Sequence, residues 1–188
     1  NPEIGVWTNT TFVNITVTSN PLMEIPEDIV AGTAPHGKET TVGYFTIKSV
    51  GNDRLINITF NLTSLEDFVV EFIPAITELD AGQQQRIDVN VTVPTGYNPG
   101  TYTGVLNVTT GNDGWKNLTI EVTVPVDRTW SMYPKQCQQL ERPTEGIACE
   151  VNVTNLGNIY INFTITPTAA NYTWAVSYTH LRAHETSL

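Results

Sequence analysis

The amino-acid sequence predicts an all-β protein built as a β-sandwich, and three observations support this. Threonine is the most frequent residue, with 29 Thr beside 17 Asn and only 6 Ser. Thr is β-branched and suits the pleated, half-solvated surface of a strand. Apolar residues alternate with polar ones over several segments, and no segment keeps a helical period. A short motif also recurs along the chain, which indicates more than one domain.

The alternation is clearest in three segments. Over residues 55–63 the side chains of Ile56, Ile58, Phe60 and Leu62 fall on one face, while Asn and Thr fall on the other. The same period of two covers residues 87–93 and 118–124. This is the pattern of strands that bury one face and expose the other.

Turn residues separate the strands. Residues 51–53 (Gly-Asn-Asp) and 111–114 (Gly-Asn-Asp-Gly) have the composition of tight turns, and residues 94–100 form a longer corner containing Pro and Gly. Seven strands are predicted, at about 22–30, 41–49, 54–63, 68–73, 85–93, 101–109 and 115–125. Seven short strands in this length predict an immunoglobulin-like sandwich, with Tyr102 at the tyrosine-corner position of the sixth strand.

An internal repeat divides the chain. Residues 50–52 and 56–60 are similar to residues 156–158 and 161–165, and residues 14–18 are similar to residues 117–121 of the last predicted strand. The sequence therefore predicts an N-terminal strand (1–20), a complete sandwich (21–126) and the first half of a second sandwich (127–176). The strand at 1–20 is either the last strand of a preceding domain or one donated to a neighbouring molecule. Residues 177–188 have no matching alternation and resemble a translated sequencing-adaptor tail, so their origin is doubtful.

Glycosylation is the strongest functional signal. Random placement of these residue types would give about three Asn-x-Ser/Thr sequons, but the chain has ten, all with Thr. They begin at Asn9, Asn14, Asn57, Asn61, Asn90, Asn107, Asn117, Asn152, Asn162 and Asn171. Outward Asn and Thr on a strand produce this pattern automatically, but that does not explain why Asn, a poor strand former, is so frequent. We expect most sequons to carry N-glycans, which would keep the sheet faces soluble.

Cys137 and Cys149 are the only cysteines. We expect them on neighbouring strands across a turn at residues 143–146, where they could form a disulfide. Such a disulfide would contribute on the order of 3 kcal/mol and fits an oxidising, extracellular setting. The alternative is two free thiols in the core.

Candidate catalytic and metal-binding residues are few. His180 and His184 have a helical zinc-ligand spacing, but they lie in the doubtful tail without a third ligand. His36 is expected to be a solvated loop residue. Asp53, Asp80 and Asp113 lie at predicted turns, where turn chemistry explains them better than a weak calcium site. We therefore expect no enzyme activity, no metal and no cofactor other than covalent sugars.

Charge and hydropathy limit the partners. The chain has 9 Lys+Arg against 19 Asp+Glu, the wrong sign for binding nucleic acid or an anionic membrane surface. No apolar run approaches the roughly 18 residues that span a bilayer. The chain begins with Asn1 and Pro2, so a signal peptide could already have been removed. An extracellular or cell-surface location is expected.

Short motifs carry a resemblance to a known group of domains. They are residues 50–52 (Val-Gly-Asn), the apolar strand at 56–60, and Val93-Pro94 leading to residues 99–102 (Pro-Gly-Thr-Tyr). The segment from about 42 to 126 resembles the Ig-like domains that accompany carbohydrate-binding modules in secreted α-galactosidases, and related repeats of archaeal and bacterial surface proteins. The resemblance implies a spacer or assembly module.

Two functions are expected from these features. The first is a structural subunit of an extracellular glycoprotein filament or surface layer. It would assemble head to tail by β-strand complementation, with residues 6–18 as donor, or as a tandem array of Ig-like domains. The second is a non-catalytic accessory or adhesion module that binds a glycan or surface ligand. The candidate residues for this are Trp7, Trp115, Trp130 and Trp174, although scattered Trp residues more often pack in cores and junctions.

Overall fold

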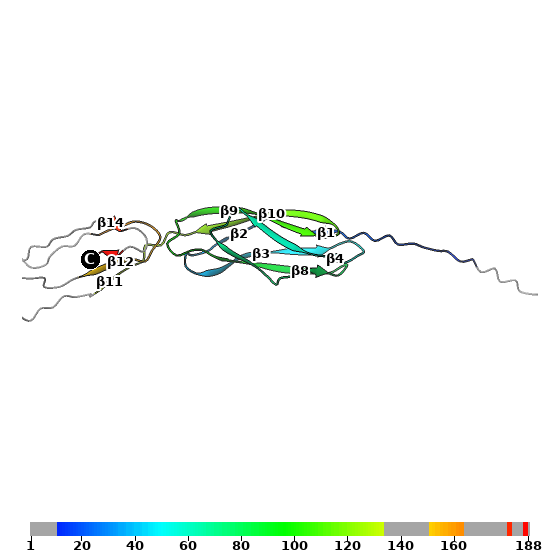
Figure 1. Ribbon diagram of the computed structural model, residues 1–188, viewed down its shortest axis with the longest axis horizontal. Coiled ribbons are helices and arrows are strands. Elements are labelled where there is room, and N and C mark those ends of the chain that lie inside the picture. Colours follow the sequence, from blue (N-terminus) through cyan, green and yellow to red (C-terminus); the bar gives the residue numbers. More distant parts are fainter. Residues whose placement is uncertain (1–10, 134–150, 164–179, 182–185, 188) are drawn as a thin grey trace, which may run out of the picture.

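The computed structural model describes residues 11–133, 151–163, 180–181 and 186–187, and the regular elements of this part are all β-strands (Figure 1). The complete sandwich consists of two four-stranded sheets. The first contains, in spatial order, β1 (Met23–Glu24), β3 (Glu39–Ser49), β8 (Gln84–Thr92) and β6 (Val69–Ile73). The second contains β2 (Ile29–Thr33), β10 (Gly114–Val124), β9 (Gly100–Thr110) and β5 (Thr59–Thr63).

The strand order is that of an immunoglobulin-like sandwich. The first sheet has the A-B-E-D order of constant-type domains, and β10, β9 and β5 correspond to strands G, F and C of the second sheet. Neighbouring strands are antiparallel, except that β2 pairs in parallel with β10. The predicted fold class is therefore confirmed, and each of the seven predicted strands has a counterpart.

Two predicted strands are interrupted. The single strand expected over residues 22–30 is divided into β1 and β2, which belong to opposite sheets. Pro26 lies between them and has no backbone N–H for a ladder, so the chain changes sheets there. The strand expected over 54–63 is divided into β4 (Leu55–Ile56) and β5, and β4 pairs instead with β7 (Glu78–Leu79). Asn57, between β4 and β5, has a positive φ of 52°, which breaks the extended backbone.

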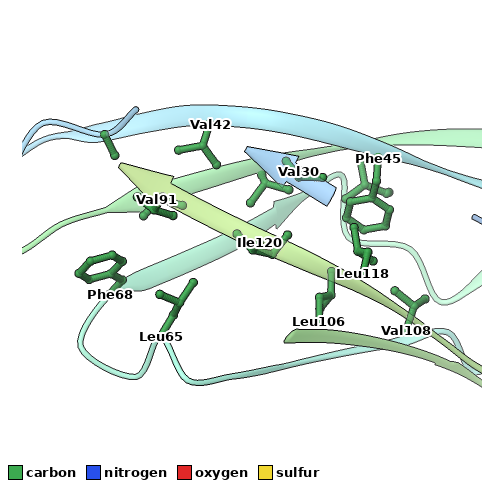
Figure 2. Packing of buried hydrophobic residues seen from close by; sticks show 14 of the residues in the cluster. Val30, Val42, Phe45, Leu65, Phe68, Val91, Leu106, Val108, Leu118 and Ile120 are labelled. Atoms are coloured by element: carbon green, nitrogen blue, oxygen red, sulfur yellow. The ribbon is translucent and has the colours of Figure 1, made fainter. Parts of the chain in front are cut away.

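The core lies between the two sheets and is filled by the inward residues of the alternating strands. Figure 2 shows Val30, Phe45, Leu106 and Ile120 among the side chains that pack between the layers. Strand β8 contributes Ile87, Val89 and Val91, each fully buried. Each such side chain stabilises the fold by about 1.5–3 kcal/mol through burial. The inward faces predicted from the period of two form the core in residues 87–93 and 118–124. At the start of residues 55–63 the prediction was wrong, since Ile56 is 41% exposed and Leu55 is fully buried. The left-handed Asn57 interrupts the alternation before Ile58.

The predicted second sandwich and both flanking segments are described in part, and the described residues of the former contribute to two small sheets. β11 (Trp130–Tyr133) pairs with β12 (Asn152–Asn155), and β13 (Ile161–Asn162) follows. Within the doubtful tail, β14 (His180–Leu181) pairs with β13 and β15 (Thr186–Ser187) pairs with β12. Residues 11–20 form no strand and extend away from the complete sandwich, at the end opposite β11 and β12 (Figure 1).

Candidate functional site: asparagine-bearing faces and the joints between sandwiches

Eight of the ten sequon asparagines lie in the described part of the chain. Five of them are exposed, namely Asn14, Asn57, Asn61, Asn117 and Asn162. Three are half-buried, namely Asn90, Asn107 and Asn152. Asn9 and Asn171 lie outside the described residues. Most of the described sequons are on strands, with the asparagine alternating against buried neighbours.

Three sequon asparagines form one row across the outer face of the second sheet. Asn107 on β9 is directly opposite Asn61 on β5 and directly opposite Asn117 on β10. Neighbouring strands in a sheet are about 4.8 Å apart, so sugars on these residues would be in contact with one another. Asn107 would have a neighbour on both sides, and its side chain is also the least exposed of the three.

Three other described sequon asparagines have different surroundings. Asn90 donates to Glu39 Oε1 (2.8 Å) and accepts from the Thr41 hydroxyl (2.7 Å). Asn57 provides the left-handed residue between β4 and β5, a conformation that Asn tolerates well. The Asn152 Oδ1 atom is buried without a hydrogen-bond partner. The backbone and its neighbours therefore favour Asn at positions 57 and 90 independently of any sugar.

A second feature is the joint at which the chain enters the complete sandwich. The side chain of Asn52, in the turn after β3, binds the backbone of the incoming segment with both of its polar atoms. The Asn20 N–H donates to Asn52 Oδ1 (2.7 Å), and Asn52 Nδ2 donates to the Thr18 carbonyl (2.9 Å). A Cβ on the preceding Gly51 would lie 2.1 Å from the Asn20 carbonyl oxygen, so glycine is required for this approach.

The joint between the two sandwiches repeats this arrangement. The Asp127 N–H donates to Asn158 Oδ1 (2.7 Å), and Asn158 Nδ2 donates to the Pro125 carbonyl (2.8 Å). A Cβ on Gly157 would lie 2.3 Å from the Asp127 carbonyl oxygen. Asn158 is 1% exposed, so both of these hydrogen bonds are shielded from water.

Asp127 also contacts the complete sandwich. The Gly96 N–H donates to His36 Nδ1 (3.1 Å), so His36 Nε2 carries the proton and donates to Asp127 Oδ2 (3.1 Å). The side chain of His36 is 8% exposed, so the expectation of a solvated loop histidine was wrong. The ring is held instead between the loop at Gly96 and the linker residue Asp127, with one ring nitrogen bonded to each.

The Asp127 carboxylate also accepts two hydrogen bonds from a residue of its own turn. The Thr129 hydroxyl (2.6 Å) and the Thr129 N–H (2.8 Å) both donate to Asp127 Oδ1. These two bonds, with a smaller contribution from His36, hold the pKa of Asp127 below its ordinary value of 3.8, although partial burial opposes them. Asp127 therefore connects the two sandwiches in its ionised form.

The residues of the two joints were not predicted from the sequence as a site. Gly51-Asn52 was interpreted as a turn, and its likeness to Gly157-Asn158 only as evidence of a repeat. The shared Gly-Asn pair was the signal that could have identified them. The joints also correct the alignment of the N-terminal segment. Thr18 takes the place of Pro125, so Asn14 corresponds to Glu121, four residues later than the motif likeness to Asn117 suggested.

The N-terminal segment presents an unpaired apolar row. Val13, Ile15 and Val17 are 76%, 82% and 75% exposed. In the alignment given by the joints, they correspond to Ile120, Val122 and Val124, which β10 buries in its own sandwich. Their sequence thus suits a buried strand, but the complete sandwich already contains such a strand.

Other predicted residues have simpler surroundings. Cys137 and Cys149 lie outside the described residues, so the disulfide stays a prediction. Asp53 accepts from Ser19 and from the Arg54 N–H, and these bonds lower its pKa. Asp80 accepts from Arg54 Nε (2.7 Å). Among the described residues no group of three or more His, Cys, Asp or Glu side chains is placed to hold a metal ion.

Comparison with known proteins shows similarity to solved structures in fold. No family model and no curated protein matches the chain. Among solved structures, a PapD-like domain of human CEP192 is 12% identical, with 66% of this chain and 98% of that domain aligned at a TM-score of 0.44. The Escherichia coli chaperone DraB is 10% identical, over 89% of this chain and 83% of that one, at a TM-score of 0.41.

A third similar structure belongs to a longer protein. A family 123 glycoside hydrolase from Clostridium perfringens is 12% identical over 52% of this chain, at a TM-score of 0.43, and the chain spans 22% of its length. The likeness to galactosidase-associated domains is not supported by a family match and stays a prediction. The described residues contain no helix that is long and apolar enough to cross a membrane.

Proposed function

We propose that this chain is a non-catalytic structural part of an extracellular glycoprotein, built from Ig-like sandwiches joined end to end. The observation that carries the proposal is the row of sequon asparagines, Asn61, Asn107 and Asn117, on the outer face of one sheet. Outward positions of a sandwich need only be polar, and Asn is a poor choice for a strand. Sugar attachment gives a reason for choosing Asn at three neighbouring positions.

The attached sugars would protect the sheet. Strand β5 is an edge of the second sheet, and Asn61 lies on it. An exposed edge strand can pair with another chain and start aggregation. A glycan at Asn61 would block lateral pairing and leave the ends of the molecule available for assembly.

Assembly along the long axis has two possible routes. In the first, the exposed row of Val13, Ile15 and Val17 enters a sandwich of a neighbouring molecule as a complementing strand. In the second, the same segment completes a preceding sandwich of one long chain, which gives a tandem array. Both routes produce a linear structure in which the segment is a last strand.

Glycopeptide mass spectrometry on native material tests the proposal. Enzymatic release of N-glycans in water enriched in ¹⁸O converts each occupied Asn into ¹⁸O-labelled Asp, so each site can be scored separately. We expect Asn61 and Asn117 to be occupied, and Asn107 to have the lowest occupancy of the row because it is flanked on both sides. Asn112, which is exposed but is not in a sequon, is the internal control. Unmodified peptide at all three sites would contradict the proposal.

One observation favours the second candidate, an accessory or adhesion module. Trp115 is 64% exposed and lies beside Thr109 and Thr59 on the face that carries the asparagine row. An exposed indole can stack on a sugar ring. Binding to a glycan array that is lost on Trp115→Ala would support this role, and an array without signal would remove it.

A further inference from the structure

The two joints share four hydrogen bonds that connect the linker to the next sandwich. They differ in that Ser19 of the first linker also donates to Asp53, whereas the second linker has Val126 at that position. Besides the contacts of Asn52 and Asn158, the Val50 N–H donates to the Leu22 carbonyl (2.9 Å), and the Leu156 N–H donates to the Thr129 carbonyl (2.9 Å). The Asn52 N–H donates to the Asn20 carbonyl (3.1 Å), and at the second joint the Asn158 N–H donates to the Asp127 carbonyl (3.1 Å).

The pairing that follows each joint is also the same. Met23 on β1 is opposite Ser49 on β3, three residues before Asn52. Trp130 on β11 is opposite Asn155 on β12, three residues before Asn158. The linker sequences differ, however, with Thr-Ser-Asn-Pro-Leu at 18–22 and Pro-Val-Asp-Arg-Thr at 125–129. The shared geometry therefore comes from backbone contacts and the Gly-Asn turn.

We propose that the Gly-Asn turn of each sandwich is a socket for the chain that leaves the last strand of another sandwich. The first socket is formed by Gly51 and Asn52, and the second by Gly157 and Asn158. The partner that fits the first socket is the end of an Ig-like sandwich whose last strand is residues 11–17. The second socket already holds the end of β10 in this way.

The chemistry of the socket makes the joint stiff. A single Asn side chain accepts from one backbone N–H of the linker and donates to a carbonyl two residues earlier, so the linker is fixed at two points. The glycine lets the two backbones approach closely enough for these bonds. Because the bonds involve linker backbone atoms, different linker sequences can be held in the same position.

The consequence is a constant relation between successive sandwiches. Two identical sockets orient the next sandwich in the same way relative to the strand that precedes it. A series of such joints repeats one rotation and one translation, which is the condition for a regular linear structure. The inference does not depend on sugars, so unoccupied sequons would leave it intact.

Exchange of the linkers in the full chain tests the proposal. Residues 125–129 are changed to the sequence of residues 18–22 by the substitutions Pro125→Thr, Val126→Ser, Asp127→Asn, Arg128→Pro and Thr129→Leu. A matched control replaces the same five residues with Gly and Ser. Backbone ¹⁵N relaxation then measures whether the complete sandwich and the segment around β11 and β12 tumble as one body.

We expect the exchanged chain to tumble as one body, like the unchanged chain, and the Gly-Ser control to show two different correlation times. Asn158→Ala should also separate the two motions, because it removes both side-chain hydrogen bonds. Asn112→Ala is its control, since Asn112 makes the same kinds of bond to Ile56 and Arg54 within the complete sandwich. Unchanged amide shifts in β3 and β8, which lie away from the substituted residues, would show that each variant is folded. The proposal is overturned if the exchanged chain behaves like the Gly-Ser control, or if Asn158→Ala stays rigid.

Discussion

At the scale of single residues, a few side chains at the ends of the complete sandwich hold the linkers in position. Asp127 is bound by His36 on one side, and its backbone is bound by Asn158 on the other. At the equivalent position of the first joint the residue is Asn20, which has no charge. The two joints share a geometry but should differ in their response to acid.

The substitution Asp127→Asn should make the second joint insensitive to acid. Because the pKa of Asp127 is lowered in the folded chain, its ionised form stabilises the joint above pH 3.8. That stabilisation is lost as the pH falls through the folded pKa. Asn keeps an oxygen that can accept from Thr129, and it cannot be protonated in this range.

The measurement is an NMR titration from pH 6 to about pH 2 that follows the Thr129 and Asn158 amides, a range set by the ordinary carboxyl pKa. The unchanged chain should show a transition below pH 3.8, and the variant should not. An equal transition in both chains would mean that another group controls the joint.

Tyr102 is a second residue with a measurable role. Its hydroxyl donates to the Asn98 carbonyl (2.9 Å), which is the tyrosine-corner bond expected from the sequence. Tyr102→Phe should lower the free energy of unfolding by about 1 kcal/mol, because the carbonyl loses its partner. Chemical denaturation gives the value. Tyr44→Phe is the control, since that ring keeps its position beneath Arg86, and an equal loss in both variants would rule out a specific contribution of the corner.

At the scale of the elements, the close approach of two strands requires a glycine. β2 crosses close to β3, and a Cβ on Gly32 would lie 2.1 Å from the Val42 carbonyl oxygen. The register between β3 and β8 shifts between Thr41 and Gly43, which marks a bulge at the same place. The glycine is therefore required by tertiary packing between the two sheets.

Gly32→Ala should destabilise the complete sandwich by about 1–3 kcal/mol, because backbone must move to admit the methyl group. Thermal unfolding followed by circular dichroism measures the change. Ala31→Ser, on the exposed neighbouring position of β2, should have little effect. If the stability of the Gly32→Ala variant is unchanged, β2 can shift to admit the methyl group without destabilising the sandwich.

At the scale of the molecule, the described part of the chain is elongated, and the chain enters the complete sandwich at one end and leaves it at the other (Figure 1). The exposed segment at residues 11–17 lies at the entry end, with Val13, Ile15 and Val17 separated by the polar residues Asn14 and Thr16. Strand complementation and a tandem array make different predictions for this segment in the isolated chain.

Under strand complementation, the purified chain should assemble as its concentration rises. Ile15→Asp should abolish assembly, because the charge would be buried in the receiving sandwich. Thr16→Asp adds the same charge at the alternate position and should leave assembly intact. Both variants are produced in a host without N-glycosylation, because Thr16 belongs to the sequon at Asn14. Light scattering with size-exclusion chromatography measures both variants. An unchanged chain that stays monomeric at every concentration would contradict complementation and favour the tandem array.

The Ig-like fold, most strands and most of their buried faces could be predicted from the sequence alone. The alternation in residues 87–93 and 118–124 is local, and each inward residue can be identified without knowing its partner. The sequons were equally visible, since each requires only three consecutive residues. The break in the first predicted strand was missed because it depends on tertiary pairing. One half, β1, pairs with β3 in the first sheet, and the other half, β2, pairs with β10 in the second.

Which residues meet across long distances in the sequence depends on the tertiary structure. The row of Asn61, Asn107 and Asn117 depends on strand register, and the contact of His36 with Asp127 joins positions 91 residues apart. The sockets depend on where the linker crosses the Gly-Asn turn. A period of two specifies which side of a strand faces inward, but pairing register and loop contacts depend on the closure of the whole sandwich.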